Sequence, residues 1–187
     1  MTTTSRSSEA SRLISLLLER SVTHGDFVLA SGRKSSYYID ARRTTMSGEG
    51  QLLIGQLGLA TLDQQDWAPR AVGGLTLGAD PVAYAIAHAA RRAGRTIDAF
   101  TVRKEAKGHG LGRRIEGNLA AGDPVVVVED VITTGHSALE AVAQVRQAGG
   151  QVLGVLAVVD REEGGRETIA AGGVPATALV LASELRV

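Results

Sequence analysis

The chain has 187 residues, of which 44% are hydrophobic and 21% are charged, a composition typical of a soluble globular protein with one hydrophobic core. Its 20 basic and 20 acidic residues balance, which argues against nucleic acid as a partner because phosphate backbones favour a basic surface. The lack of cysteine excludes disulfides and zinc–thiolate sites, and no apolar run approaches the roughly 20 residues of a membrane helix, so no membrane partner is expected.

The N-terminal segment, residues 1–8, is rich in Ser and Thr and has no apolar stretch behind a basic start. We therefore expect a disordered tail rather than a signal peptide, and a cytoplasmic protein. The remainder, residues 9–187, shows no internal repeat or linker and is expected to form a single domain. It starts with a helix at Ala10–Arg20, where leucines and an isoleucine give a broad apolar face.

Two short strands are expected next, Phe27–Leu29 and Tyr37–Asp40, which could pair as a hairpin or a small accessory sheet. The segment before them, His24–Asp26, is typical of a turn. Ser47 then suits the capping position of a helix that we expect to run to about Asp63.

A glycine-rich stretch, GGLTLGA, follows the next expected strand, which begins at Ala71. Asp80 comes directly before a proline, so the pair is expected to start a helix, with Asp80 as the cap and Pro81 as the first helical residue. That helix is expected to run to about Arg92, and a strand is expected at Ile97–Val102.

The second half alternates strands with a helix. Arg103–Asn118 has no apolar periodicity and is expected to be a long polar loop or flap. Val125–Val128 and Val152–Val159 are continuous apolar runs, typical of strands covered on both faces, and a helical segment, Ala138–Gln147, lies between them. This βαβ pattern predicts an α/β fold with a parallel sheet, to which Ala178–Leu181 could add an edge strand.

Two acidic residues, Glu129 and Asp130, stand at the carboxyl end of the Val125–Val128 strand, where open α/β sheets bind ligands. The loop after them, Thr133–Ser137, offers hydroxyls and backbone N–H groups at a helix N-terminus, which suits an anion. Because paired carboxylates repel a bare phosphate, the pattern favours a ligand with both a sugar diol and a phosphate. The alternative is an ordinary helix cap with solvated acids.

The string VVVVEDVITTGHSA resembles the signature with which type I phosphoribosyltransferases bind phosphoribosyl pyrophosphate (PRPP). The resemblance implies a central, mostly parallel sheet flanked by helices, with a small N-terminal hood at about 9–46 and a core at about 47–187. It implies Mg²⁺ as a cofactor, held mainly by PRPP and in part through water to the two acids, with no direct protein ligand. The implied PRPP contacts are Glu129, Asp130, Val131, Ile132, Thr133, Thr134, Gly135, His136 and Ser137.

Positive charge is concentrated after the Ile97–Val102 strand, in the string RKEAKGHG. Cations that close over a departing diphosphate would stabilise the transition state, and a mobile loop would exclude water. On composition alone, a solvated charged loop is the alternative. The string resembles the catalytic loop of orotate phosphoribosyltransferases, which implies a mobile flap at about 103–118 with catalytic and PRPP-binding roles for Arg103, Lys104, Lys107 and His109.

The same resemblance implies a homodimer in which the flap reaches the neighbouring subunit's site. Arg113 and Arg114, further along the flap, are expected to be solvated or to contact the partner subunit. The implied reaction transfers the ribose 5-phosphate of PRPP to orotate and gives orotidine 5′-monophosphate and diphosphate, a step of pyrimidine biosynthesis.

Orotate needs a cation for its carboxylate, partners for its ring edge and a cover for its ring face. Arg161 follows the Val152–Val159 strand at the same sheet edge as the acids, and guanidinium matches a carboxylate in a bidentate way. The resemblance implies orotate contacts for Thr133 and Arg161, whereas a rim ion pair with Glu162 or Glu163 is the alternative for Arg161. Either Tyr37 or Tyr38 could cover the base while the other packs inward.

The sequence departs from the family pattern at two places where many members carry a lysine. Ala30 precedes Ser-Gly-Arg, and Thr76-Leu77 replaces a Tyr-Lys pair in the glycine-rich stretch, so neither lysine role is carried over. Two other functions remain open: a phosphoribosyltransferase for a purine base, against which Arg161 and the RKEAKGHG string argue, and a PRPP-sensing regulator that binds nucleic acid, against which the neutral composition argues.

Overall fold

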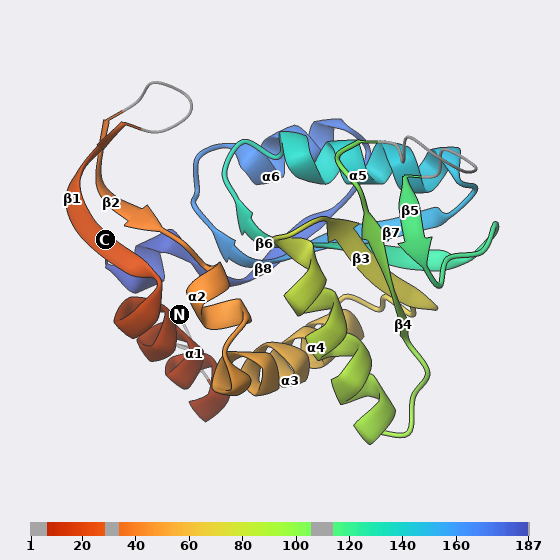
Figure 1. Cartoon of the computed structure of the whole chain (residues 1–187), viewed down its shortest axis with the longest axis horizontal. Coiled ribbons are helices and arrows are strands. Elements are labelled where there is room, and N and C mark those ends of the chain that lie inside the picture. The colour runs from red at the N-terminus through yellow and green to blue at the C-terminus, as the bar shows by residue number, and fades with distance from the viewer. Residues whose placement is uncertain (1–6, 29–33, 106–113, 187) are drawn as a thin grey trace, which may run out of the picture.

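The computed structural model describes residues 7–28, 34–105 and 114–186, and its centre is a sheet with the strand order β5-β4-β3-β6-β7-β8 (Figure 1). Within the described residues β5 pairs antiparallel to β4, and all other neighbours in this sheet are parallel. The strands are β3 (Ala71–Leu75), β4 (Asp98–Val102), β5 (Ile115–Gly117), β6 (Pro124–Ile132), β7 (Gln151–Asp160) and β8 (Ala176–Leu181).

Helices cover both faces of this sheet, which confirms the predicted α/β class (Figure 1). One face packs against α1 (Ser8–Arg20), α3 (Gly48–Gln64) and α4 (Ala79–Arg92), and the other against α5 (His136–Gln147) and α6 (Gly165–Ala171). A short helix, α2 (Arg42–Thr45), and a 3₁₀ turn, η1 (Ala182–Leu185), complete the helical elements of the described chain. None of the described helices is long and apolar enough to cross a membrane.

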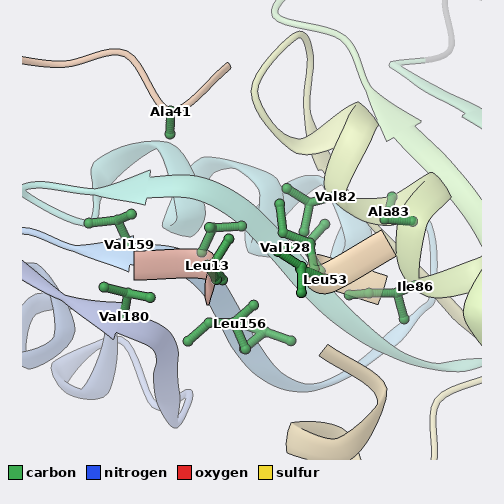
Figure 2. Close-up of a cluster of buried hydrophobic side chains, with 14 of the residues drawn as sticks. Leu13, Ala41, Leu53, Val82, Ala83, Ile86, Val128, Leu156, Val159 and Val180 are labelled. Carbon is green, nitrogen blue, oxygen red and sulfur yellow. The ribbon is translucent and has the colours of Figure 1, made fainter. Parts of the chain in front are cut away.

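The apolar run of β6 is buried on both sides, as its continuous hydrophobicity predicts. Val126 and Val128 pack in the cluster under α3 and α4, whereas Val125 and Val127 pack in the cluster under α5. Figure 2 shows Val128 in the first cluster with side chains of α3, α4 and β7. Each such valine or leucine contributes about 1.5–3 kcal/mol by burial, so the strand that carries the two acids is held rigidly at its core.

Outside the main sheet, β1 (Val22–Val28) and β2 (Lys34–Ile39) form an antiparallel two-stranded sheet, the accessory sheet that the sequence predicts (Figure 1). The predicted turn at His24–Asp26 is wrong, because these residues lie within β1. The one extra residue of β1 is absorbed as a register shift between His24 and Phe27, which keeps both ends of the strand paired.

Three further boundaries differ from the sequence-based expectation. The tail expected over residues 1–8 overlaps α1, since the Ser7 side chain accepts a hydrogen bond from the Ala10 N–H and Ser8 is helical. The loop expected over 103–118 contains β5, and α6 was not expected at all. Ser47 does cap α3 as predicted, with its Oγ atom accepting from the Gly50 N–H at 3.1 Å.

Asp80 does not cap α4. The helix starts at Ala79 after Gly78, and β3 extends through the first two glycines of the glycine-rich stretch. The Asp80 carboxylate instead accepts hydrogen bonds from the hydroxyls of Thr76, at 2.8 Å, and Thr101, at 2.9 Å. Asp80 therefore ties the loop after β3 to the neighbouring strand.

Candidate active site

The carboxyl ends of β3 and β6 meet at the point where the sheet order reverses. From β3 the chain proceeds to β4 on one side, and from β6 to β7 and β8 on the other. Their following helices, α4 and α5, lie on opposite faces, so a crevice opens between the two strand ends. The acids and the Thr-rich loop predicted from the sequence lie at this crevice.

Glu129 is the more deeply buried of the two acids, with 6% of its surface exposed and no hydrogen-bond partner for Oε1 among the described residues. Burial and, to a smaller extent, the neighbouring charge of Asp130 raise the pKa of Glu129 to about 8, while Lys104 acts in the opposite direction. Burial also raises the pKa of Asp130, while a hydrogen bond from the Val131 N–H lowers it. Such a pair is suited to exchange hydrogen bonds with ligand hydroxyls.

The loop after β3 approaches the acids closely at Gly78. A Cβ atom at this position would lie 2.5 Å from Oδ1 of Asp130, so a larger residue would displace the carboxylate. The peptide bond between Thr76 and Leu77 in the same loop is cis. The close approach of the Gly78 backbone to the Asp130 carboxylate explains why this position holds a glycine.

The loop from Thr133 leads directly into α5, which begins at His136 without a side-chain cap. Gly135 occupies the cap position with φ of 81°, a left-handed conformation that glycine adopts without strain. The first N–H groups of α5 thus have no capping side chain to accept them, which leaves them for an anion. The Thr134 hydroxyl lies 3.0 Å from Nδ1 of His136.

Three cavities surround the acids in the described chain. The loop cavity is lined by Glu129, Val131, Ile132, Thr133, Thr134, Gly135, Ser137 and Ala138. The hood cavity is lined by Tyr38, Ile39, Asp40, Ala41, Arg42, Asp130, Val131, Thr133, Thr134 and Arg161. The glycine-loop cavity is lined by Arg42, Leu75, Thr76, Leu77, Gly78, Lys104, Glu129, Asp130 and Ser137. The crevice thus offers three adjoining compartments with different chemistry.

The hood cavity contains Arg161, which is 7% exposed. Its Nε atom lies 2.8 Å from Oε1 of Glu163, although off the line of a hydrogen bond, so the ion pair considered from the sequence does exist. The guanidinium also lies over the ring of Tyr37, which packs against the core. Tyr38 is 43% exposed, contacts the ring of Phe27 and lines the cavity, so Tyr38 is the tyrosine that faces this compartment.

The base of the flap is held by Arg114, for which the sequence predicts a solvated position or a contact with the partner subunit. Its Nε donates to the Arg103 carbonyl at 2.9 Å, and its Nη2 donates to the Lys104 carbonyl at 2.6 Å and pairs with Glu140 of α5. With 24% of its side chain exposed, Arg114 is a structural anchor rather than a solvated charge.

The flap cations are only partly within the described residues. Lys104 is exposed and lines the glycine-loop cavity, and Arg103 Nη1 lies 3.6 Å from Oε1 of Glu116. Lys107 and His109 fall outside the described residues. The crevice therefore brings together one predicted flap cation with both acids.

Most predicted residues line the three cavities, and His136 is the exception in the predicted loop, since its exposed ring contacts Thr134 and lines none of them. The sequence-based reasoning missed Arg42 and Asp40. Arg42 follows the short strand expected at Tyr37–Asp40 by two residues, so its position beside an expected site element was the one available signal.

Comparison with known proteins is consistent with this geometry. The chain is 52% identical to an orotate phosphoribosyltransferase of Corynebacterium glutamicum over 186 residues, which cover 99% of this chain and 98% of that relative. An orotate phosphoribosyltransferase of Aquifex aeolicus is 49% identical over 180 residues, covering 95% of this chain and 97% of the relative. No protein-family model matches the chain.

Solved structures give the same result. The crystal structure of the Mycobacterium tuberculosis orotate phosphoribosyltransferase in complex with PRPP matches with a TM-score of 0.82 at 44% identity, over 96% of this chain and 99% of that one. The same enzyme in complex with Fe(III) dicitrate matches with a TM-score of 0.86 at 47% identity and the same coverage. An adenine phosphoribosyltransferase of Leishmania tarentolae, at 15% identity and a TM-score of 0.61, shares the fold alone.

Proposed function

The chain belongs to the orotate phosphoribosyltransferase family, and on this premise we propose that its crevice transfers the ribose 5-phosphate of PRPP to orotate, giving orotidine 5′-monophosphate and diphosphate in pyrimidine biosynthesis. The observation that carries the proposal is the arrangement of three cavities around one acid pair. PRPP has two anionic ends joined by a ribose, and orotate is a third anionic group, so the substrates need three adjoining compartments.

The loop cavity is the compartment for the 5-phosphate. The backbone N–H groups at the start of α5 and the hydroxyls of Thr133, Thr134 and Ser137 supply donors there, and the helix dipole favours negative charge. In the proposed complex the segment from Val131 to Ser137 surrounds the phosphate. Glu129 lines both this cavity and the glycine-loop cavity, and Asp130 lines the glycine-loop and hood cavities. In the proposed complex both acids accept hydrogen bonds from the two ribose hydroxyls.

The hood cavity is the compartment for orotate. Arg161 binds the substrate carboxylate, and Thr133 meets the ring edge. Tyr38 covers the ring face, since it is the hood tyrosine that lines the cavity. A purine base carries no carboxylate, so the buried Arg161 would gain no anionic partner from it.

The glycine-loop cavity is the compartment for the diphosphate, with Lys104 and the flap residues Arg103, Lys107 and His109 closing over it. In the reaction the bond from the anomeric carbon to the diphosphate oxygen breaks, and its electron pair stays on that oxygen. N1 of orotate forms the new bond, and the N1 proton is taken up by the diphosphate. Cations that meet the growing charge lower the barrier. Lys107→Ala should therefore reduce kcat far more than it raises the KM for PRPP.

A divalent cation fits this site only with help from the substrate. Within the described residues no group of three or more His, Cys, Asp or Glu could hold a metal ion, but Glu129 has a buried oxygen without a hydrogen bond. Mg²⁺ chelated by the diphosphate and ribose hydroxyls of PRPP would meet these acids through water. When bound, it would neutralise charge on the diphosphate.

The protein acts as a homodimer in this proposal, with the flap of each subunit reaching its partner's crevice. A groove between α3 and α4 supports a subunit contact, because Leu52 and Tyr84 line it and each is 54% exposed. Light scattering should give the mass of a dimer, and Leu52→Glu should shift it toward that of a monomer.

Mixing two inactive variants, Lys107→Ala and Arg161→Gln, should restore about a quarter of the activity if the active sites are shared between subunits, and none if each subunit's site is self-contained.

The experiment that tests the proposed function is the consumption of orotate at its ultraviolet absorption band in the presence of PRPP and Mg²⁺. Adenine, hypoxanthine and uracil serve as competing bases under the same conditions. The proposal predicts turnover of orotate that depends on PRPP and exceeds that of every other base. Turnover of a purine base in preference to orotate, or binding of nucleic acid without any turnover, would refute it.

A further inference from the structure

Arg42 and Asp130 are the two residues that line both the hood cavity and the glycine-loop cavity in the described chain. Under the proposed function these compartments hold orotate and diphosphate. The bond that breaks and the bond that forms share one carbon between them. Arg42 thus lies where the leaving group and the incoming base are closest.

The helix that carries Arg42 is held in place by buried contacts. Arg42 is the first residue of α2, whose Thr44 and Thr45 are fully buried. The Thr44 hydroxyl lies 2.7 Å from the Ser21 hydroxyl, and the side-chain amide of Gln51 donates to the Thr45 carbonyl at 2.5 Å. These contacts fix the backbone from which Arg42 extends.

One edge of the guanidinium is already occupied. Nε of Arg42 donates to Oδ1 of Asp40 at 2.8 Å, and this pairing lowers the pKa of Asp40 and raises that of Arg42. Among the described residues no hydrogen bond reaches the two terminal nitrogens of Arg42, and its side chain is 47% exposed. The terminal nitrogens are therefore available to a ligand, and Asp40 orients them.

The chemistry at this boundary requires a cation. Orotate and diphosphate are both anions, and negative charge grows on the diphosphate oxygen as its bond to the anomeric carbon breaks. Asp130, the other residue at the boundary, is an acid and cannot offset that charge. Guanidinium binds two phosphate oxygens in a planar, bidentate way, and a preorganised cation is worth most where charge develops.

We propose that Arg42 is a catalytic residue that contacts the diphosphate of PRPP, at the phosphate bonded to the ribose, and stabilises the charge left there when the glycosidic bond breaks. Asp40 is its positioning residue. This inference rests on the proposed assignment of the glycine-loop cavity to diphosphate. It differs from that assignment in placing part of the charge stabilisation on a residue of the hood rather than on the flap.

The test compares Arg42→Gln and Arg42→Lys with Arg43→Gln, an exposed arginine of the same helix that lines none of the three cavities. Arg42→Gln should lower kcat roughly 30- to 100-fold in the forward direction and raise the KM for diphosphate in the reverse reaction with orotidine 5′-monophosphate. The KM for orotate should change less than about threefold. Arg42→Lys should recover part of the loss, and Arg43→Gln should behave as the parent.

Asp40→Asn provides the second variant, since it leaves Arg42 in place but removes its anchor. It should lower kcat by roughly tenfold and add little to the loss in an Arg42→Gln background. Additive losses in the double variant would refute the positioning role. Thermal unfolding of each variant should match the parent, because the pair is exposed on one side.

Two results would overturn the proposal for Arg42: kinetics of Arg42→Gln that equal the parent, or a loss confined to the KM for orotate. A parallel variant, Ser137→Ala, tests the compartments themselves. If Ser137→Ala raises the KM for PRPP while Arg42→Gln is silent, the inference fails alone. If neither variant affects PRPP or diphosphate, the proposed assignment of compartments fails with it.

Discussion

The guanidinium of Arg161 lies over the ring of Tyr37, with its Cζ atom 4.9 Å from the ring centroid. Glu163 meets the same guanidinium at Nε, and the arginine is almost fully buried. Packing against an aromatic face and an ion pair on one edge fix the orientation of the group while its cavity side remains open to a ligand. A recognition cation held in this way loses little entropy when a carboxylate binds.

Arg161→Gln should therefore weaken the use of orotate selectively. Loss of a bidentate charged contact costs about 3 kcal/mol, so kcat/KM for orotate should fall roughly 100-fold, while the KM for PRPP changes less than about threefold. Steady-state kinetics with each substrate varied in turn would show this. Arg166→Gln is the matched control, since Arg166 is 43% exposed and lines none of the three cavities.

A second variant separates recognition from stability. Removing Arg161 alone takes a cation away from the Glu163 carboxylate, and 13% of the Glu163 side chain is exposed. The double variant Arg161→Gln Glu163→Gln should unfold nearer to the parent temperature and still reject orotate. A double variant that regains orotate turnover would show that Arg161 acts only as a structural partner of Glu163.

Glu129 should make the stability of the ligand-free protein depend on pH. Its pKa in the folded chain is raised from 4.5 to about 8, so between these values the folded state binds more protons than the unfolded state. The free energy of unfolding should therefore be highest below about pH 4.5 for this group and fall as the pH rises through about 8, by on the order of 5 kcal/mol.

Urea unfolding at several pH values would measure this slope. Glu129→Gln should remove most of the fall between pH 5 and 8, because the amide mimics the protonated carboxyl. Glu167→Gln, at an exposed position of α6, should leave the slope unchanged. A parent protein whose stability rises across this range, with no difference in the Glu129 variant, would contradict the burial argument.

Gly135→Ala should destabilise the protein and impair PRPP binding together. The position has φ of 81°, and an added Cβ would lie 2.5 Å from the Gly165 carbonyl oxygen, so the loop would have to move. We expect a loss of about 2–4 kcal/mol and a KM for PRPP at least tenfold higher.

The matched control is Gly122→Ala. Gly122 has a similar φ of 87° but nothing within 4 Å of an added Cβ, and it lies in the turn before β6, at the opposite end of the strand from the acids. It should lose about 1 kcal/mol with an unchanged KM for PRPP. Equal effects of the two substitutions on PRPP binding would show that the loop conformation at Gly135 is not used by the ligand.

Arg114→Gln should affect turnover more than binding. Arg114 holds the carbonyls of Arg103 and Lys104 against Glu140, which fixes the backbone where the flap begins. Without it we expect kcat to fall roughly tenfold, with less than a threefold change in the KM for PRPP. Arg95→Gln breaks an ion pair with Asp63 elsewhere and should be silent. A change in the KM for PRPP without any loss of kcat in Arg114→Gln would rule out the anchoring role.

The sheet edge and its acids could be predicted because their signals are local. The unbroken valine run of β6 requires burial on both faces, and the order of strand, acids, loop and helix places the acids at the carboxyl edge. Ser47 could be predicted in the same way, since a cap uses only the residues of its own helix start.

The positions that the sequence did not predict depend on contacts between elements that are distant in the sequence. The sequence predicts that Asp80 caps a helix, but its carboxylate instead accepts a hydrogen bond from the hydroxyl of Thr101 on β4. The strand β5 has three residues without a hydrophobic pattern and exists because β4 offers it an unpaired edge. Arg42 lines the crevice because the accessory sheet before it packs there, and no spacing of residues in the sequence specifies that packing. Tertiary contacts decide each of these positions.

A crystal structure of the protein with PRPP and Mg²⁺ would measure directly where the substrate lies in the three cavities. We predict the 5-phosphate against the backbone of Gly135 and Ser137, the ribose hydroxyls at Glu129 and Asp130, and the diphosphate in the cavity between Leu77 and Lys104. Density for PRPP with its two anionic ends exchanged, or bound away from the β6–α5 loop, would contradict this prediction.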